Sequence, residues 1–165
     1  CLLDSQNRIE AIALIHEKLY RTGNLAQVNF AEYILDVISN LTDSYNVHSR
    51  EILLDLDIAS ICLGIDRAIP CGLIINELVS NSLKHAFPST QAGQLQVKLS
   101  VDKDFKLTLI VKDDGVGLPK NFDLAQISSL GLQLVQDFVN QLKGTLQINC
   151  NQGTTFRITF PGEEC

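Results

Sequence analysis

The sequence lacks the long apolar run and the positive charge that mark two common classes of protein. No run reaches the roughly 18 to 20 apolar residues that a membrane-spanning helix needs, and no charged-then-apolar leader precedes the first helix. The formal net charge is -6, which would repel a nucleic-acid backbone. We therefore expect a cytoplasmic chain that contacts neither a membrane nor nucleic acid.

The sequence also lacks any C-x-x-C pair. Its five cysteines are dispersed and odd in number, which favours free thiols in a reducing compartment over a disulfide framework or a zinc site. They are Cys1, Cys62, Cys71, Cys150 and Cys165. No internal repeat or low-complexity tract is present, so the chain must be interpreted from its local patterns.

The composition is that of a globular protein. A chain of 165 residues suits one compact domain with an added helical piece, and 45% hydrophobic with 19% charged residues is typical of soluble globular chains. A single nucleotide remains possible as a ligand despite the negative charge. Backbone amides and one magnesium ion can outweigh the global charge locally.

Hydrophobic periodicity predicts helices interleaved with strands. Apolar residues at helical spacing indicate helices and alternating ones indicate strands. Because antiparallel pairs alternate with long helices, we expect an α+β fold with one mixed sheet and helices on a single face. The predicted helices are 2–20, 29–41, about 66–86 and 130–142, and the predicted strands are 51–57, 95–101, 107–111, 145–149 and 154–160.

One polar stripe runs along the predicted helix through residues 73–86. Asn81 lies one helical turn after Glu77, and Lys84 and His85 lie on the next turn of the same face. Burying these groups costs free energy unless each finds a partner. A charged ligand is one candidate partner, and a partly exposed, solvated stripe is the equally weighted alternative.

A second candidate site follows a predicted strand. Asp113 at a strand end could accept a hydrogen bond from an exocyclic amine such as that of adenine. Gly115 and Gly117 would let the backbone approach a flat or phosphorylated ligand without a Cβ clash. In isolation, a plain Asp-Gly turn explains the same residues more simply.

Two further segments are weak when taken alone. Residues 128–132 lead from a loop into a helix, where exposed amides favour phosphate, but any N-cap has the same appearance. Gly153 and Thr154 could bracket a nucleotide or could simply turn a hairpin. The order of all four segments along the chain is more specific than any one of them.

That order resembles the nucleotide-binding boxes of the GHKL ATPases, and most closely the catalytic and ATP-binding domain of sensor histidine kinases. Residues 73–86 resemble the N box, 113–117 the G1 box, 130–132 the G2 box and 153–154 the G3 box. Residues 7–20 are similar to the dimerisation region of the subfamily related to HWE kinases.

The resemblance implies a fold and a division of the chain. The fold is a two-layer α/β sandwich of the Bergerat type, preceded by a dimerisation helix. We expect residues 1–24 to end the helical dimerisation and phosphotransfer region and residues 25–165 to form the catalytic and ATP-binding domain. The first helix has no start signal, so we also expect the chain to be a piece of a longer protein.

The resemblance also implies that the cofactors are ATP and Mg²⁺. Asn81 would supply an oxygen to magnesium, Glu77 would polarise or orient groups around it, and Lys84 and His85 would lie near the phosphates. Asp113 would contact adenine beside Thr154. The remaining expected ATP-binding residues are Gly115 and Gly117, which shape the pocket, and Leu130, Gly131 and Leu132, which follow a lid at 118–129.

Two positions depart from the family pattern. The G2 box normally carries more than one glycine, and only Gly131 is present here. His16 begins a His-Glu pair, but the proline that usually follows a phosphoacceptor is missing. In the subfamily that the chain resembles, the acceptor lies on the preceding helix, so the resemblance implies an acceptor histidine upstream of this chain. We interpret His48 as a surface loop residue.

The implied function is transfer of the ATP γ-phosphoryl group to a histidine and then to an aspartate of a response regulator receiver domain, in a homodimeric full-length kinase. Two alternatives stay open. An anti-sigma-type serine kinase would not need the helix at 2–20. A nucleotide-binding dimerisation module without kinase activity would agree with the single glycine of the G2 box.

Overall fold

The computed structural model describes residues 2–22, 28–87, 92–118 and 130–162. Five strands form the main sheet in the order β2-β4-β5-β7-β6. β2 is parallel to β4, and every other neighbouring pair is antiparallel. The strands are β2 (Ile52–Ile58), β4 (Gly93–Val101), β5 (Lys106–Asp113), β6 (Thr145–Asn149) and β7 (Thr154–Pro161).

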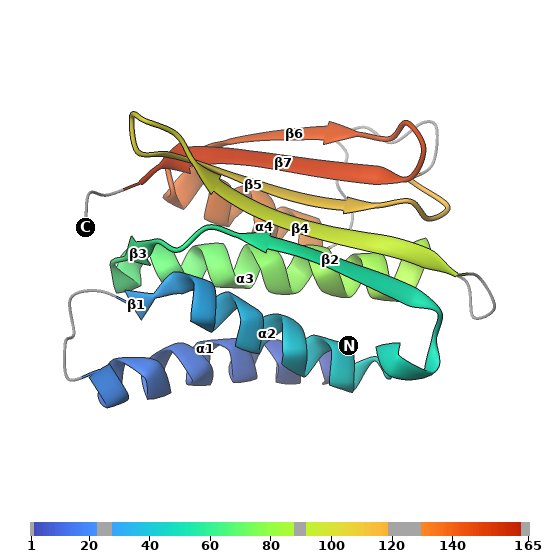
Figure 1. Cartoon of the computed structure of the whole chain (residues 1–165), viewed down its shortest axis with the longest axis horizontal. Coiled ribbons are helices and arrows are strands. Elements are labelled where there is room, and N and C mark those ends of the chain that lie inside the picture. The colour runs from blue at the N-terminus through green and yellow to red at the C-terminus, as the bar shows by residue number, and fades with distance from the viewer. Residues whose placement is uncertain (1, 23–27, 88–91, 119–129, 163–165) are drawn as a thin grey trace.

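The helices all lie on one side of this sheet (Figure 1). α3 and α4 lie next to the sheet, and α1 and α2 pack on α3 from the far side. Among the described residues, no helix is long and apolar enough to cross a membrane. The α-helices are α1 (Leu2–Thr22), α2 (Phe30–Ser44), α3 (Ile65–Asn81) and α4 (Leu130–Gln141).

α3 is the centre of the hydrophobic core. Its residues Ile74, Ile75 and Leu78 are fully buried, because the helix is covered by the sheet on one side and by α1 and α2 on the other. In β4, β5 and β7 the inner side chains alternate with mostly polar outer ones, as in a half-buried sheet. The inner set comprises Leu95, Val97, Leu99, Leu107, Leu109, Val111, Phe156, Ile158 and Phe160.

The predicted fold class, a mixed sheet with helices on one face, is confirmed. Asn29 caps α2 as expected, and its side chain accepts a hydrogen bond from the Glu32 amide at 3.4 Å. Short elements were not predicted from the sequence, since two or three residues show no period. They are the ribbon of β1 (Val28–Asn29) with β3 (Cys62–Leu63), and the 3₁₀ turn η1 (Val47–Ser49).

The predicted helix through residue 86 changes its hydrogen bonding near its end. α3 passes at Ser82 into a single π-helical turn, η2 (Ser82–Ala86). Such turns are rare and often occur at functional sites. The predicted polar stripe thus continues from α3 into an irregular turn, which the helical period of the sequence did not predict.

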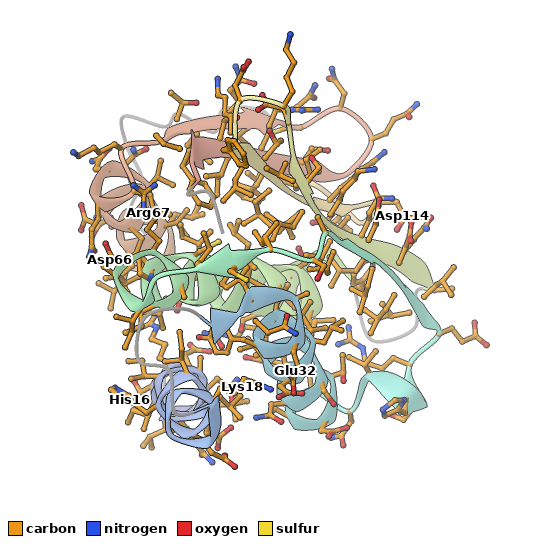
Figure 2. The ribbon with its side chains drawn as sticks, turned by 60° about the vertical axis from the view of Figure 1, so that its left-hand side comes forward. His16, Lys18, Glu32, Asp66, Arg67 and Asp114 are labelled. Carbon is orange, nitrogen blue, oxygen red and sulfur yellow. The ribbon has the colours of Figure 1, made fainter. Side chains whose placement is uncertain are left out.

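The first helix is packed more tightly than expected. Ala11 and Ile15 are buried, and the hydroxyl of Tyr33 donates to the Ala11 carbonyl at 3.0 Å. The helical spacing alone predicts that the apolar residues from Ile9 to Tyr20 are exposed in a monomer and that the chain self-associates. For Ala11 and Ile15 the predicted exposure is wrong, because α1 packs on α2 and α3. Ion pairs from Lys18 to Glu32 and Asp36 add to the contact with α2, while His16 points outward (Figure 2).

Candidate functional site

Asp113 ends β5, and its buried carboxylate accepts hydrogen bonds from three donors. One oxygen, Oδ2, accepts from the Ser82 hydroxyl at 2.9 Å. The other, Oδ1, accepts from the amides of Gly115 and Thr154, each at 3.2 Å. Burial raises the pKa of Asp113, although these three hydrogen bonds act in the opposite direction. The structure thus brings Asp113, Gly115 and Thr154 together as the resemblance implied.

The glycines around Asp113 are needed for close backbone packing. A Cβ on Gly115 would lie 2.2 Å from the Ala86 carbonyl oxygen, and one on Gly153 would lie 2.0 Å from the Asp113 carbonyl oxygen. Gly153 and Gly117 also have positive φ angles, 91° and 73°, which residues with a Cβ rarely adopt. The glycine spacing therefore maintains the arrangement around Asp113.

The π-helical turn connects α3 to this cluster at two points. Ser82, its first residue, donates to Asp113. Ala86, its last residue, accepts a hydrogen bond at 2.9 Å from the amide of Val116 in the glycine-containing loop. Ser82 was not singled out as a site residue from the sequence, although it directly follows Asn81.

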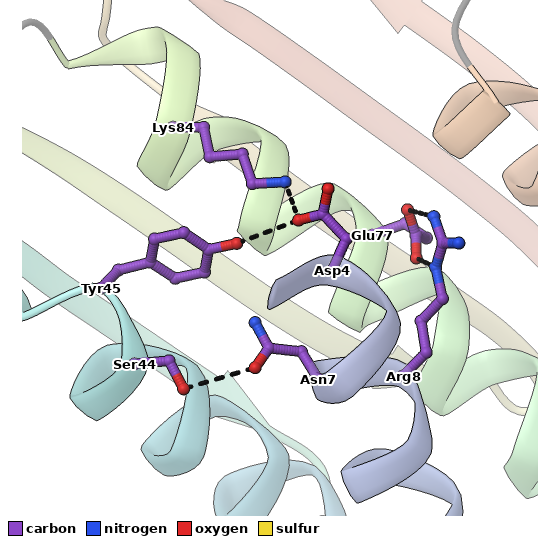
Figure 3. A network of polar contacts seen from close by, with 7 residues as sticks. All are labelled: Asp4, Asn7, Arg8, Ser44, Tyr45, Glu77 and Lys84. Carbon is purple, nitrogen blue, oxygen red and sulfur yellow. Dashed lines mark hydrogen bonds and ion pairs between the residues drawn. The ribbon is translucent and has the colours of Figure 1, made fainter. Parts of the chain in front are cut away.

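The polar stripe of α3 finds its partners on α1. Glu77 is buried and forms a two-point ion pair with Arg8, whose Nη2 lies 2.9 Å from Glu77 Oε2 (Figure 3). Neither alternative considered from the sequence, a ligand or solvent, describes this pairing. Arg8 could not be predicted as the partner, because nothing in the sequence indicates that α1 packs on this face.

The next turn of the stripe makes a second connection to α1. Lys84 pairs with Asp4, which also accepts from the Tyr45 hydroxyl at 3.3 Å (Figure 3). The Lys84 ammonium lies 5.9 Å from the centre of the Tyr45 ring, within cation–π range. His85, by contrast, is exposed. Lys84 and His85 are thus in different environments, although the same role was expected of both.

Asn81 lies between the two connections and is half-buried. Its carboxamide has no hydrogen-bond partner within the part of the chain that the structure describes. Gly131 of α4 is its neighbour, since a Cβ there would lie 3.8 Å from Asn81 Nδ2 and 2.8 Å from Glu77 Oε2. The residues fit a Mg²⁺ ion that takes one protein oxygen and fills its shell with phosphates and water.

The described residues contain no cluster of three or more His, Cys, Asp or Glu side chains that could hold a metal. A site in this region would therefore depend on Asn81 and on the ligand's own oxygens. Of the other expected residues, Leu130 is exposed and Leu132 is buried. The predicted lid lies outside the described residues, apart from Leu118.

Comparison with known proteins places the chain in a family. Residues 67–164 match the family described as histidine kinase-, DNA gyrase B- and HSP90-like ATPase. The chain belongs to this family. Residues 1–45 match a second family, described as histidine kinase. The two matches together include α1, α2, all of α3 except its first two residues, and both ends of the candidate site.

Relatives from two bacteria are similar over most of the chain. The sensor histidine kinase PdtaS of Mycobacterium tuberculosis is 35% identical over 151 residues, which are 88% of this chain and 29% of the relative. The blue-light-activated histidine kinase 2 of Erythrobacter litoralis is 25% identical over 157 residues, 93% of this chain and 45% of the relative. The chain thus spans less than half the length of these relatives.

A solved structure has the same fold. The histidine kinase domain of the Erythrobacter litoralis EL346 blue-light activated histidine kinase superposes with a TM-score of 0.88 at 24% identity, covering 96% of this chain and 74% of that one. All of these matches are to proteins named histidine kinases. Nothing among them favours a serine kinase or a module without catalytic activity.

Proposed function

We propose that this chain is the catalytic part of a sensor histidine kinase of a two-component system, which binds Mg-ATP and transfers its γ-phosphoryl group to a histidine. The observation that carries the proposal is the position of Asp113. Its carboxylate is buried, held by three donors, and linked through Ser82 to the helix that bears Glu77 and Asn81.

We assign the base-binding role to the Asp113 end of the site. An ionised carboxylate can only accept hydrogen bonds, so it suits the exocyclic amine of adenine and opposes the carbonyl that guanine has at the same position. Thr154 lies beside it, and Gly115 and Gly117 keep the backbone close. The three donors from the protein fix the direction of the carboxylate before a nucleotide arrives.

We assign the phosphate role to the other end of the site, at the last turn of α3. Asn81 holds the metal ion, Glu77 orients the groups around it, and Gly131 lets α4 approach both. When bound, Mg²⁺ neutralises charge on the phosphates. Transfer breaks the bond between the γ-phosphorus and the oxygen that bridges to the β-phosphate, and forms a bond to an imidazole nitrogen that gives up its proton. ADP leaves with that oxygen.

The wider assembly is also a proposal. We propose a homodimeric full-length kinase in the cytoplasm, in which residues 1–24 end the dimerisation region and residues 25–165 form the catalytic domain. The phosphoryl group would pass to an aspartate on a response regulator receiver domain. We do not assign the acceptor role to His16. We expect the acceptor histidine on a helix that precedes residue 1 in the full-length protein.

Phosphohistidine formation tests this function. The full-length protein containing this chain should take up the γ-phosphate of ATP in an acid-labile, base-stable form, and Asn81→Ala should abolish the uptake. The matched variant Asn40→Ala, at an exposed position of α2, should leave it unchanged. An acid-stable phosphoprotein would contradict the histidine kinase and indicate a hydroxyl acceptor instead.

A further inference from the structure

Arg50 lies outside the candidate site and binds the backbone of the π-helical turn that follows α3. It lies between η1 and β2 and is half-buried. Its Nη1 donates to the Leu83 carbonyl at 2.8 Å and its Nη2 to the Phe87 carbonyl at 2.7 Å. One guanidinium group thus binds two backbone carbonyls that flank the second half of the π-helical turn.

These carbonyls need a partner that the helix cannot supply. The last carbonyls of a helix have no intrahelical donor, and they carry the negative end of the helix dipole. A guanidinium group presents parallel N–H donors in a fixed fork and retains its positive charge. Arg50 therefore satisfies two acceptors and complements the dipole at once, whereas a lysine lacks the fixed pair of parallel donors.

The same turn makes both contacts to the Asp113 cluster. Ser82 donates to Asp113 at one end of the turn, and Ala86 accepts from Val116 at the other. The carbonyls bound by Arg50 lie between and directly after these two residues. A shift of the turn would consequently move Ser82 away from Asp113 and Ala86 away from the glycine-containing loop.

We propose that Arg50 is a positioning residue for the base-binding end of the nucleotide site. It acts on Asp113 through the turn Ser82–Ala86 without touching the nucleotide itself. The proposal deepens the proposed function and rests on it for the identity of the ligand. The positioning itself is a property of the nucleotide-free protein and can be measured there.

The first experiment therefore uses amide hydrogen exchange without nucleotide. In Arg50→Gln, the amide of Val116 should exchange at least about tenfold faster than in the wild type, because its bond to Ala86 is weakened. The amides of the β6–β7 ladder should be unchanged. Arg157→Gln is the matched control, since Arg157 is exposed on β7. Unchanged exchange at Val116 in Arg50→Gln would overturn the proposal.

The second experiment measures base selectivity by calorimetry with non-hydrolysable analogues of ATP and GTP and magnesium. Arg50→Gln should bind the ATP analogue about tenfold more weakly and lose preference for it over the GTP analogue. A general loss of stability would weaken both nucleotides equally and would contradict positioning.

Two further outcomes are separable. If Arg50→Gln does not fold, Arg50→Lys is used for the same two measurements. The proposal would be overturned if Arg50→Lys showed both the exchange rate at Val116 and the base selectivity of the wild type. If the wild type binds no nucleotide, the proposed function fails, whereas exchange at Val116 still shows whether Arg50 holds the turn.

Discussion

Arg8 on the first helix and Glu77 on the third form a two-point ion pair across 69 positions of sequence. The pair attaches the N-terminal half of α1 to the helix that bears Asn81, and Asp4 with Lys84 makes a second attachment one turn further on. α1 is thus fixed to the residues that we assign to the phosphate end of the site.

Loss of Arg8 should destabilise the protein measurably. Arg8→Gln leaves the buried Glu77 carboxylate without its charged partner, which we expect to cost about 1–3 kcal/mol of unfolding free energy given the partial solvent access of Arg8. A double-mutant cycle with Glu77→Gln in chemical denaturation measures the coupling. We expect the double variant to lose clearly less than the sum of the single variants, and strict additivity would contradict the pair.

The buried carboxyl of Asp113 should make stability depend on pH. Burial raises its pKa above the ordinary 3.8, so the folded chain keeps this proton to higher pH than the unfolded chain does. Its contribution to stability is full below pH 3.8 and is lost as the pH rises through the raised pKa. Denaturation from acidic to neutral pH should show wild type losing stability relative to Asp113→Asn. The opposite trend would contradict the raised pKa.

Gly115 should be essential for nucleotide binding. In Gly115→Ala, the new Cβ meets the Ala86 carbonyl, which belongs to backbone and cannot move cheaply, so we expect at least about a tenfold loss of ATP affinity. Gly162→Ala is the control. Its Cβ would lie 2.4 Å from the Phe105 carbonyl, at the opposite end of the β5–β7 pair, and should lower stability while sparing affinity. Equal ATP affinities of Gly115→Ala and Gly162→Ala would argue against a nucleotide site around Asp113.

Gly72 and Tyr33 should determine how α2 packs on α3. A Cβ on Gly72 would lie 2.3 Å from the Tyr33 hydroxyl oxygen, so Gly72→Ala should cost about 1–3 kcal/mol through overpacking. Tyr33→Phe, which loses the bond to Ala11, should cost about 1 kcal/mol. Thermal and denaturant unfolding measure both. A neutral Gly72→Ala would mean that the Tyr33 side chain can move aside without cost.

Self-association should depend on the part of α1 that stays exposed. The exposed apolar side chains of α1 include Leu2, Leu3 and Ile9, which are 86%, 40% and 66% exposed. They form a smaller apolar surface than the whole apolar face of the helix would. We expect association at micromolar concentration in sedimentation, weakened in Ile9→Ser. A monomeric wild type would contradict the proposed contact.

The secondary structure could be predicted from the sequence because long helices and strands repeat their own periods. The strand at residues 52–58, the helix that follows and the strand at 93–101 also form the strand–helix–strand order of a parallel crossover, so the parallel pairing of β2 with β4 was signalled but not inferred. The π-helical turn had no such signal, since its residues continue the helical spacing of α3.

The candidate site could be predicted in part. Asp113, Gly115 and Thr154 meet because they lie at paired ends of β5 and β7, and their order along the chain indicated this. Asp4 and Arg8 lie one helical turn apart, a spacing that predicts a pair within the helix. Arg8 instead binds Glu77 of α3 and Asp4 binds Lys84 of η2, and only the packing of α1 reveals this.

Calorimetric binding of a non-hydrolysable ATP analogue, with and without magnesium, tests the central claim most directly. We expect the chain to bind in the presence of magnesium, to lose affinity when the metal is chelated, and to lose binding in Asp113→Asn and in Asn81→Ala while both variants stay folded. Binding that is indifferent to magnesium and to both substitutions, or no binding by the folded wild type, would contradict the proposed kinase site.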